Sequence, residues 1–139
     1  MFNYEQILQN ELNYLCDSYN LERIKVKVNS SLFVTTKEKR KYMLGQLDLQ
    51  KKRIILNEKL LLEKDGEIEL VKGLYHEFRH YWQYQNYREV YLRWLSTQNR
   101  EAYNKYYYTD TCSIEADARE FGDNFGNFDR EDLLKKDNR

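Results

Sequence analysis

The sequence predicts a domain of the α+β class, in which several helices and one small sheet share a core. Apolar residues recur at three- and four-residue steps in residues 2–18, which predicts an N-terminal helix. Between residues 22 and 57 the period changes to two, which predicts a three-stranded sheet. Helical periodicity then returns. The 139 residues suffice for a single domain spanning 1–139, with a charged tail, 129–139, that we expect to fray.

The composition argues against several classes of function. Lys and Arg together number 23, as do Asp and Glu, so the formal net charge is zero. No overall positive field points to nucleic acid, and we expect no nucleic-acid partner. No apolar run approaches ~20 residues and the first residues lack a signal-peptide pattern, so we expect no membrane partner and a cytoplasmic protein. Cys16 and Cys112 form no CxxC pair and are expected to be reduced thiols.

The first predicted elements are the N-terminal helix and the three strands. The packing face of the helix is expected to contain Phe2, Ile7, Leu8, Leu12, Leu15 and Tyr19, with Cys16 beside it. In residues 22–29, apolar residues alternate with basic ones, which predicts a half-buried strand. Residues 42–49 and 52–57 predict a hairpin, in which Gly45 indicates a bulge or a close backbone approach. The basic stretch 35–41 is expected to be a solvated loop.

The most informative stretch is His76-Glu77-Phe78-Arg79-His80, which contains His-Glu-x-x-His. Residues four apart lie on one face of a helix, one turn apart, so both imidazoles can bind one metal ion. Glu77 can then reach a water on that ion and act as general base. The alternative is a chance match on an amphipathic helix. Against it, the chain has two histidines and both lie in this motif.

The helix that carries the motif is predicted to run from about Glu67 to Asn86, and further helices are expected after it. We expect the motif helix to pack through Ile68, Val71, Tyr75, Phe78 and Trp82, with Gln83 beside the histidines on another face. In the aromatic segment 87–108, one helix face is expected to hold Val90, Trp94 and Leu95. The final helix is expected to pack through Ile114, Ala118, Phe121 and Phe125.

The tyrosines of the aromatic segment allow two interpretations. The run Tyr106-Tyr107-Tyr108 could pack in the core, as aromatic stripes commonly do. It could instead line a cleft, where a tyrosine hydroxyl could donate a hydrogen bond to the oxyanion that forms when a peptide carbonyl is attacked. The sequence does not choose between them.

A third metal ligand must come from elsewhere in the chain, because catalytic zinc usually takes three protein ligands. No third histidine exists, so the ligand must be Cys, Asp or Glu. We favour Glu115, because Ala118 and Gly122 on the same helix face permit a close approach to the motif helix. Asp117 is the alternative ligand, or it orients a histidine N–H. Glu115 could also be a first-turn acid favoured by the helix dipole, and Glu120 is expected at the surface.

His-Glu-x-x-His with a downstream Glu-x-x-Ala-x-x-Phe, here beginning at Glu115, resembles compact zinc metallopeptidases of the gluzincin type. It is most similar to the ImmA/IrrE-like and minigluzincin families, often found in bacteria and phages. The resemblance implies a zincin-like fold with the order N-terminal helix, small sheet, metal helix and ligand helix. It implies one zinc ion per chain, with His76, His80 and Glu115 as metal ligands and Glu77 as the catalytic base.

The resemblance also implies how a substrate binds. A strand beside the metal helix, within residues 42–49, is expected to take up the substrate as an added β-strand. The chain departs from the pattern at one position, because ImmA/IrrE-like proteins commonly have a small residue where this chain has Arg79.

The expected function is therefore zinc-dependent hydrolysis of peptide bonds in a peptide or protein substrate. The alternative is a catalytically silent zincin-fold module that holds a structural metal and binds a partner, for example through the aromatic segment 87–108. A weaker alternative is nucleic-acid binding through the basic run 37–41, which the neutral net charge argues against.

Overall fold

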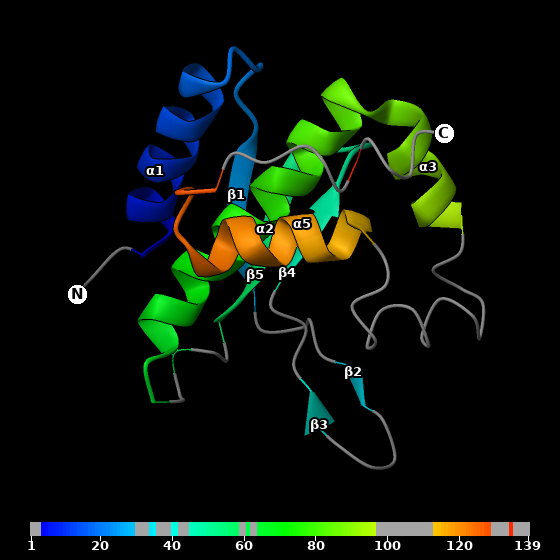
Figure 1. Ribbon diagram of the computed structural model, residues 1–139. Helices are drawn as coiled ribbons and strands as arrows, with labels where there is room; N and C mark the ends of the chain where they lie inside the picture. Colours follow the sequence, from blue (N-terminus) through cyan, green and yellow to red (C-terminus); the bar gives the residue numbers. More distant parts are fainter. Residues whose placement is uncertain are drawn as a thin grey trace.

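The fold is of the α+β class, with four helices and a small three-stranded mixed sheet among the residues described. The computed structural model describes residues 4–29, 34–35, 40–41, 45–58, 61, 64–96, 113–128 and 134. The elements in chain order are α1 (Tyr4–Ser18), β1 (Lys25–Asn29), β2 (Val34–Thr35), β3 (Arg40–Lys41), β4 (Gly45–Asp48), β5 (Arg53–Asn57), α2 (Gly66–Asn86), α3 (Arg88–Ser96) and α5 (Ser113–Asp123) (Figure 1). None of the described helices is long and apolar enough to cross a membrane.

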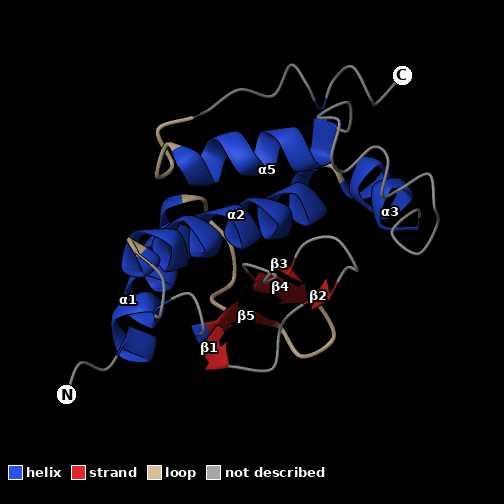
Figure 2. Ribbon diagram, turned by 90° about the horizontal axis from the view of Figure 1, so that it is seen from below, coloured by secondary structure: helices blue, strands red, loops and turns tan. Residues whose placement is uncertain are grey.

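Helix α2 is the central element of the fold. It lies between α5 on one side and the sheet on the other, with α1 and α3 toward its two ends (Figure 2). Because it is covered on several sides, every residue from Glu77 to Gln83 is buried. The sequence predicted that Ile68 would be the first packing residue of this helix. This prediction is wrong, since Ile68 is 48% exposed, whereas Leu70 and Leu74 are buried.

The sheet has the strand order β1-β5-β4. Strand β1 runs parallel to β5, with Val26 opposite Ile54, and β4 runs antiparallel to β5, with Gly45 opposite Leu56. The predicted hairpin is confirmed, and its turn covers residues 49–52. Its register places the buried side chains of β5 beneath α2, on the side of the sheet where the core lies.

The sequence predicted a solvated loop for the basic stretch 35–41. This prediction is wrong at the two ends of the stretch. Its ends pair as a separate two-stranded antiparallel sheet of β2 and β3, with Thr35 opposite Arg40. Val34 and Thr35 are β-branched and favour an extended backbone. The prediction of a loop considered only how polar and basic the stretch is. Residues 36–39, which make up most of the basic run, lie outside the described part.

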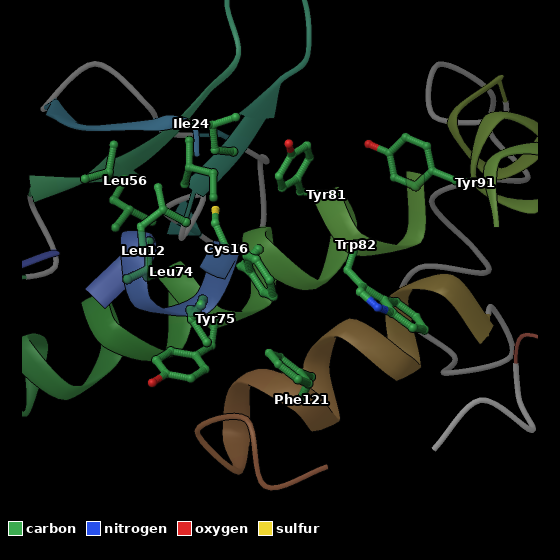
Figure 3. Packing of buried hydrophobic residues seen from close by; sticks show 14 of the residues in the cluster. Leu12, Cys16, Ile24, Leu56, Leu74, Tyr75, Tyr81, Trp82, Tyr91 and Phe121 are labelled. Carbon is green, nitrogen blue, oxygen red and sulfur yellow. The ribbon is translucent and has the colours of Figure 1, made fainter. Parts of the chain in front are cut away.

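The core joins the two sides of α2. Leu12, Cys16, Ile24, Leu56 and Leu74 meet between α1, the sheet and α2, whereas Tyr75 and Phe121 meet between α2 and α5 (Figure 3). Cys16 is buried and free, as expected. Ile7, expected on the packing face of α1, is 47% exposed, because the buried stripe follows the spacing of Leu8, Leu12 and Leu15 instead. Phe2 lies outside the described residues.

Helix α5 ends earlier than its apolar pattern indicates. The backbone N–H of Gly126 donates to the carbonyl of Phe121, and that of Phe125 donates to the carbonyl of Gly122, which is a Schellman motif. Phe125 therefore adopts a left-handed backbone (φ 49°) beyond the helix and is 45% exposed, so its predicted packing role is wrong. Within the tail predicted to fray, the structure describes Leu134, whose side chain is fully buried.

Candidate metal centre

The three residues proposed as metal ligands come together between α2 and α5. His76 and His80 project from α2 one turn apart, and Glu115 projects from the first turn of α5. One nitrogen of each histidine and one carboxylate oxygen all lie within 4.8 Å of one another. The predicted proximity of these side chains is confirmed, and they are close enough to bind one metal ion.

Small residues on α5 allow this convergence. A Cβ atom added at Gly122 would lie 2.8 Å from the backbone oxygen of Lys72 and 3.2 Å from Cβ of His76. Any side chain at this position would push α5 away from α2, and Ala118, one turn earlier, is fully buried. The expectation that Ala118 and Gly122 permit a close approach is therefore confirmed.

The Glu115 carboxylate lies close to the ring nitrogens of both histidines. Oε1 of Glu115 is 2.6 Å from Nε2 of His76, and Oε2 is 3.5 Å from Nε2 of His80. Both carboxylate oxygens of Glu115 therefore face the histidines, and the residue is 3% exposed. Two imidazole nitrogens and one carboxylate are the donor set that catalytic zinc sites use, so these residues would fit a zinc ion.

Glu77 lies next to this centre and next to the edge of the sheet. Its side chain is 7% exposed. A Cβ atom at Gly45 would lie 3.2 Å from Cγ of Glu77 and 2.8 Å from the backbone oxygen of Ile55, which confirms the close approach expected at this glycine. Burial raises the pKa of Glu77 and outweighs the opposing charges of the two histidines. A carboxylate with a raised pKa is better suited to accept a proton near neutral pH.

The charges of the centre depend on one another. Burial alone would lower the pKa of His80, but the hydrogen bond and charge of Glu115, with smaller contributions from Glu77 and Gln83, raise it to about 9. Burial alone would raise the pKa of Glu115, but the two histidines outweigh burial and hold that pKa well below its ordinary range. Without a metal, the centre therefore holds a buried imidazolium–carboxylate pair.

This pairing predicts how the stability of metal-free protein depends on pH. A raised pKa of His80 stabilises the fold at pH values below its ordinary pKa of about 6.5, and this contribution is lost as the pH rises through about 9. In urea titrations of chelator-treated protein, we expect the free energy of unfolding to fall by up to about 3 kcal/mol over this range. His80→Gln should flatten this dependence, and an equally steep fall in that variant would contradict the assignment.

Asp117 is not one of the three converging residues and bonds Arg79 and Gln83 instead. Its carboxylate accepts hydrogen bonds of 2.8 and 3.2 Å from the guanidinium of Arg79, and both side chains are fully buried. The Arg79 guanidinium also stacks on the rings of Trp82 and Phe121, 3.7 and 4.9 Å from their centroids. Arg79, the residue at which the chain departs from the ImmA/IrrE-like pattern, thus has Asp117 on α5 as its partner. Glu120 is exposed, as predicted.

Helix α3 brings two aromatic side chains to the centre. The Trp94 ring stacks on the His80 imidazole, with centroids 4.9 Å apart and planes at 18°. The Tyr91 ring lies 6.0 Å from the same imidazole, and its hydroxyl points away from α3 (Figure 3). Burial raises the pKa of Tyr91, and the charges of Glu77 and Glu115 raise it further. The predicted burial of Trp94 is confirmed, whereas the position of Tyr91 beside His80 was not predicted from the sequence.

The position of Tyr91 had a signal in the sequence. It follows Val90, a predicted packing residue, and precedes Trp94 by three residues, so both aromatic rings can face one partner on a helix. Leu95, the third residue of the predicted face, is half-buried. The predictions for Tyr106-Tyr107-Tyr108 and for Cys112 fall outside the described residues.

Comparisons of the chain with models of protein families, with curated proteins and with solved structures give no match. The assignment of a function therefore depends on the residues of this centre and on the geometry described above.

Proposed function

We propose that the protein is a zinc-dependent peptidase with a zincin-like fold of the gluzincin type. The observation that carries the proposal is the convergence of His76, His80 and Glu115, with the buried carboxylate of Glu77 directly beside them. Two histidines and one carboxylate leave the charge of a zinc ion only partly neutralised and keep one position open. A structural zinc site is usually closed by four protein ligands, so the donor set favours catalysis.

The chain's own residues have distinct roles in this proposal. His76, His80 and Glu115 hold the ion. When bound, zinc lowers the pKa of a coordinated water and polarises a carbonyl oxygen. Glu77 accepts a proton from the attacking water and then delivers it to the nitrogen of the leaving amine, so that the peptide bond breaks without releasing an unstable anion. The raised pKa of Glu77 supports both transfers.

The arrangement of the sheet supports binding of the substrate as an added strand. The outer edge of β1 is occupied by α1, because the Gln9 side chain bonds the backbone of Ile24 and Val26, and Glu5 accepts from the N–H of Val28. Among the described strands, β4 pairs on one side only, with β5.

The strand whose second edge pairs with no described strand is also the one that contacts the proposed base. Gly45, at the start of β4, lies against Glu77. A peptide extended along β4 would therefore pass the proposed base with its backbone hydrogen-bonded to the protein.

Tyr91 is the described tyrosine best placed to assist. Its ring centroid lies 6.0 Å from that of His80, and burial together with the charges of Glu77 and Glu115 raises the pKa of its hydroxyl. In the proposed reaction this hydroxyl donates a hydrogen bond to the oxyanion.

The direct test measures zinc and cleavage together. Purified protein should carry close to one zinc ion per chain, and it should cleave members of an internally quenched peptide library. A zinc chelator should abolish cleavage, and added zinc should restore it. Glu115→Gln should lose most of the bound zinc, whereas Glu120→Gln, which changes an exposed residue on the same helix, should keep it.

The same measurements identify the alternative function. Stoichiometric zinc without cleavage of any library peptide would favour a silent module whose metal is structural. Failure to bind zinc would overturn the proposed centre itself. A cytoplasmic setting belongs to the proposal, and the free, buried thiol of Cys16 supports it.

A further inference from the structure

A chain of buried polar groups leads from His80 to helix α5, and no role in binding the metal or in transferring protons accounts for it. Nδ1 of His80 is 2.7 Å from Oε1 of Gln83. Nε2 of Gln83 donates to the backbone oxygen of Ile114 (2.9 Å) and to Oδ2 of Asp117 (2.8 Å). Gln83 and Asp117 are both fully buried. Burying these groups is costly unless each hydrogen bond is made, so the arrangement constrains the site.

The chemistry of these partners fixes the orientation of the Gln83 amide. A backbone carbonyl and a carboxylate only accept hydrogen bonds, so the end of the amide that faces Ile114 and Asp117 must be its NH2 group. The other end is then the carbonyl oxygen, which only accepts. Nδ1 of His80 must therefore carry a hydrogen.

A hydrogen on Nδ1 leaves the lone pair of the neutral His80 imidazole on Nε2. This is the nitrogen that lies 3.5 Å from the Glu115 carboxylate, at the metal position. The network thus selects the tautomer that a metal requires at Nε2 and holds the ring at the matching angle.

Asp117 is itself held in place. Arg79 binds both of its oxygens, and the guanidinium lies over the rings of Trp82 and Phe121. Arg79 lies one turn before Gln83 on α2, and Asp117 lies two residues after Glu115 on α5. The network therefore ties the helix of the two histidines to the helix of the third ligand at the level of the ligands.

We infer that Gln83 and Asp117 are positioning residues, which fix the tautomer and orientation of His80 and couple them to the helix that carries Glu115. The inference deepens the proposed function and rests on it for its consequence. Loss of a partner that orients a metal-binding histidine typically weakens metal affinity by about 10- to 100-fold. We expect a loss of this size without Gln83.

The test compares Gln83→Met with Gln85→Met. Both changes replace a glutamine of α2 by methionine, but Gln85 is exposed, so it is a matched control. The first measurement is NMR of metal-free protein labelled with 15N-histidine, which contains only two imidazoles, at a pH above about 9, where the His80 ring is neutral. Wild type and Gln85→Met should show a protected Nδ1–H proton and an unprotonated Nε2 for His80, and Gln83→Met should lose this preference.

The second measurement is zinc affinity by competition with a chromophoric chelator. Gln83→Met should bind zinc about 10- to 100-fold more weakly than wild type, and Gln85→Met should bind within about twofold. Gln83→Asn, which keeps an amide but shortens it by one methylene group, should behave like Gln83→Met and replaces it if that variant does not fold. An unchanged Nδ1–H signal together with unchanged zinc affinity in a folded Gln83 variant would overturn the inference.

The two measurements separate this inference from the proposed function. Neither depends on cleavage, so an inactive protein that binds zinc still tests the role of Gln83. If the wild type shows the protected Nδ1–H proton and binds no zinc, the proposed metal centre fails while the positioning of His80 by Gln83 stands. If Gln83→Met loses neither property and wild type cleaves peptides, the inference alone fails.

Discussion

Replacing Glu77 by glutamine is expected to lower the rate of peptide cleavage by about 10²- to 10⁴-fold and to leave the bound zinc in place. Glutamine has the shape of glutamate but cannot accept the proton of the attacking water. Glu77 is not among the three converging residues that could hold the ion, so the affinity for the ion should change little. The measurement is kcat/KM on one library peptide, together with zinc content by atomic absorption.

The control for this variant is Glu89→Gln, an equivalent change at an exposed position on α3. It should retain the wild-type kcat/KM. Tyr91→Phe provides a graded comparison, since it should keep zinc and lose less activity than Glu77→Gln because it removes a single hydrogen-bond donor. Undiminished cleavage by Glu77→Gln would exclude Glu77 as the base and would require a different mechanism.

Replacing Arg79 by methionine is expected to destabilise the fold by about 3–5 kcal/mol. Arg79 and Asp117 are both fully buried, and removal of the guanidinium leaves a buried carboxylate without its cationic partner. The same change removes the stacking on Trp82 and Phe121. Urea unfolding of chelator-treated wild type and variant measures the difference in the free energy of unfolding without a contribution from zinc binding.

Two further variants establish whether the buried charge is the cause. Arg23→Met removes an ion pair with Asp17 in which both side chains are more than half exposed, and it should change stability by no more than about 1 kcal/mol. Combining Arg79→Met with Asp117→Asn should recover part of the loss, because no unpaired charge then remains. Equal stabilities of Arg79→Met and Arg23→Met would contradict this account of the pair.

Much of the fold was predictable because its signals are local. The alternation of Ile24, Val26 and Val28 with basic residues predicted β1, and the apolar steps of residues 2–18 predicted α1. Helix α2 was predicted within one residue at its start, where Asp65-Gly66 breaks the pattern. The errors at Ile7 and Ile68 have a common physical cause: neighbouring apolar residues on a helix differ by 100° in direction, and only the packing partner decides which of them is covered.

The candidate site was predictable to the extent that residue type and spacing constrain it. Two histidines four residues apart on a helix share one face. Because the chain has no other histidine, the third ligand was expected to be Cys, Asp or Glu, and an acidic residue was favoured. Glu115 was preferred over Asp117 because Ala118 and Gly122, on the same helix face as Glu115, predicted a close contact with the motif helix. The convergence of His76, His80 and Glu115 agrees with that choice.

By itself, the sequence determined the α+β class, the helix that carries the histidines and the residue types available to hold a metal. These follow from periodicity and spacing, which depend on neighbours along the chain. Only the tertiary structure revealed that Arg79 and Gln83 both bond Asp117, and that Tyr91 and Trp94 lie against the imidazole of His80. The buried groups of α2, α3 and α5 meet only when the helices pack. Their partners are far apart in the chain, so no local sequence pattern predicts which buried group bonds or contacts which other.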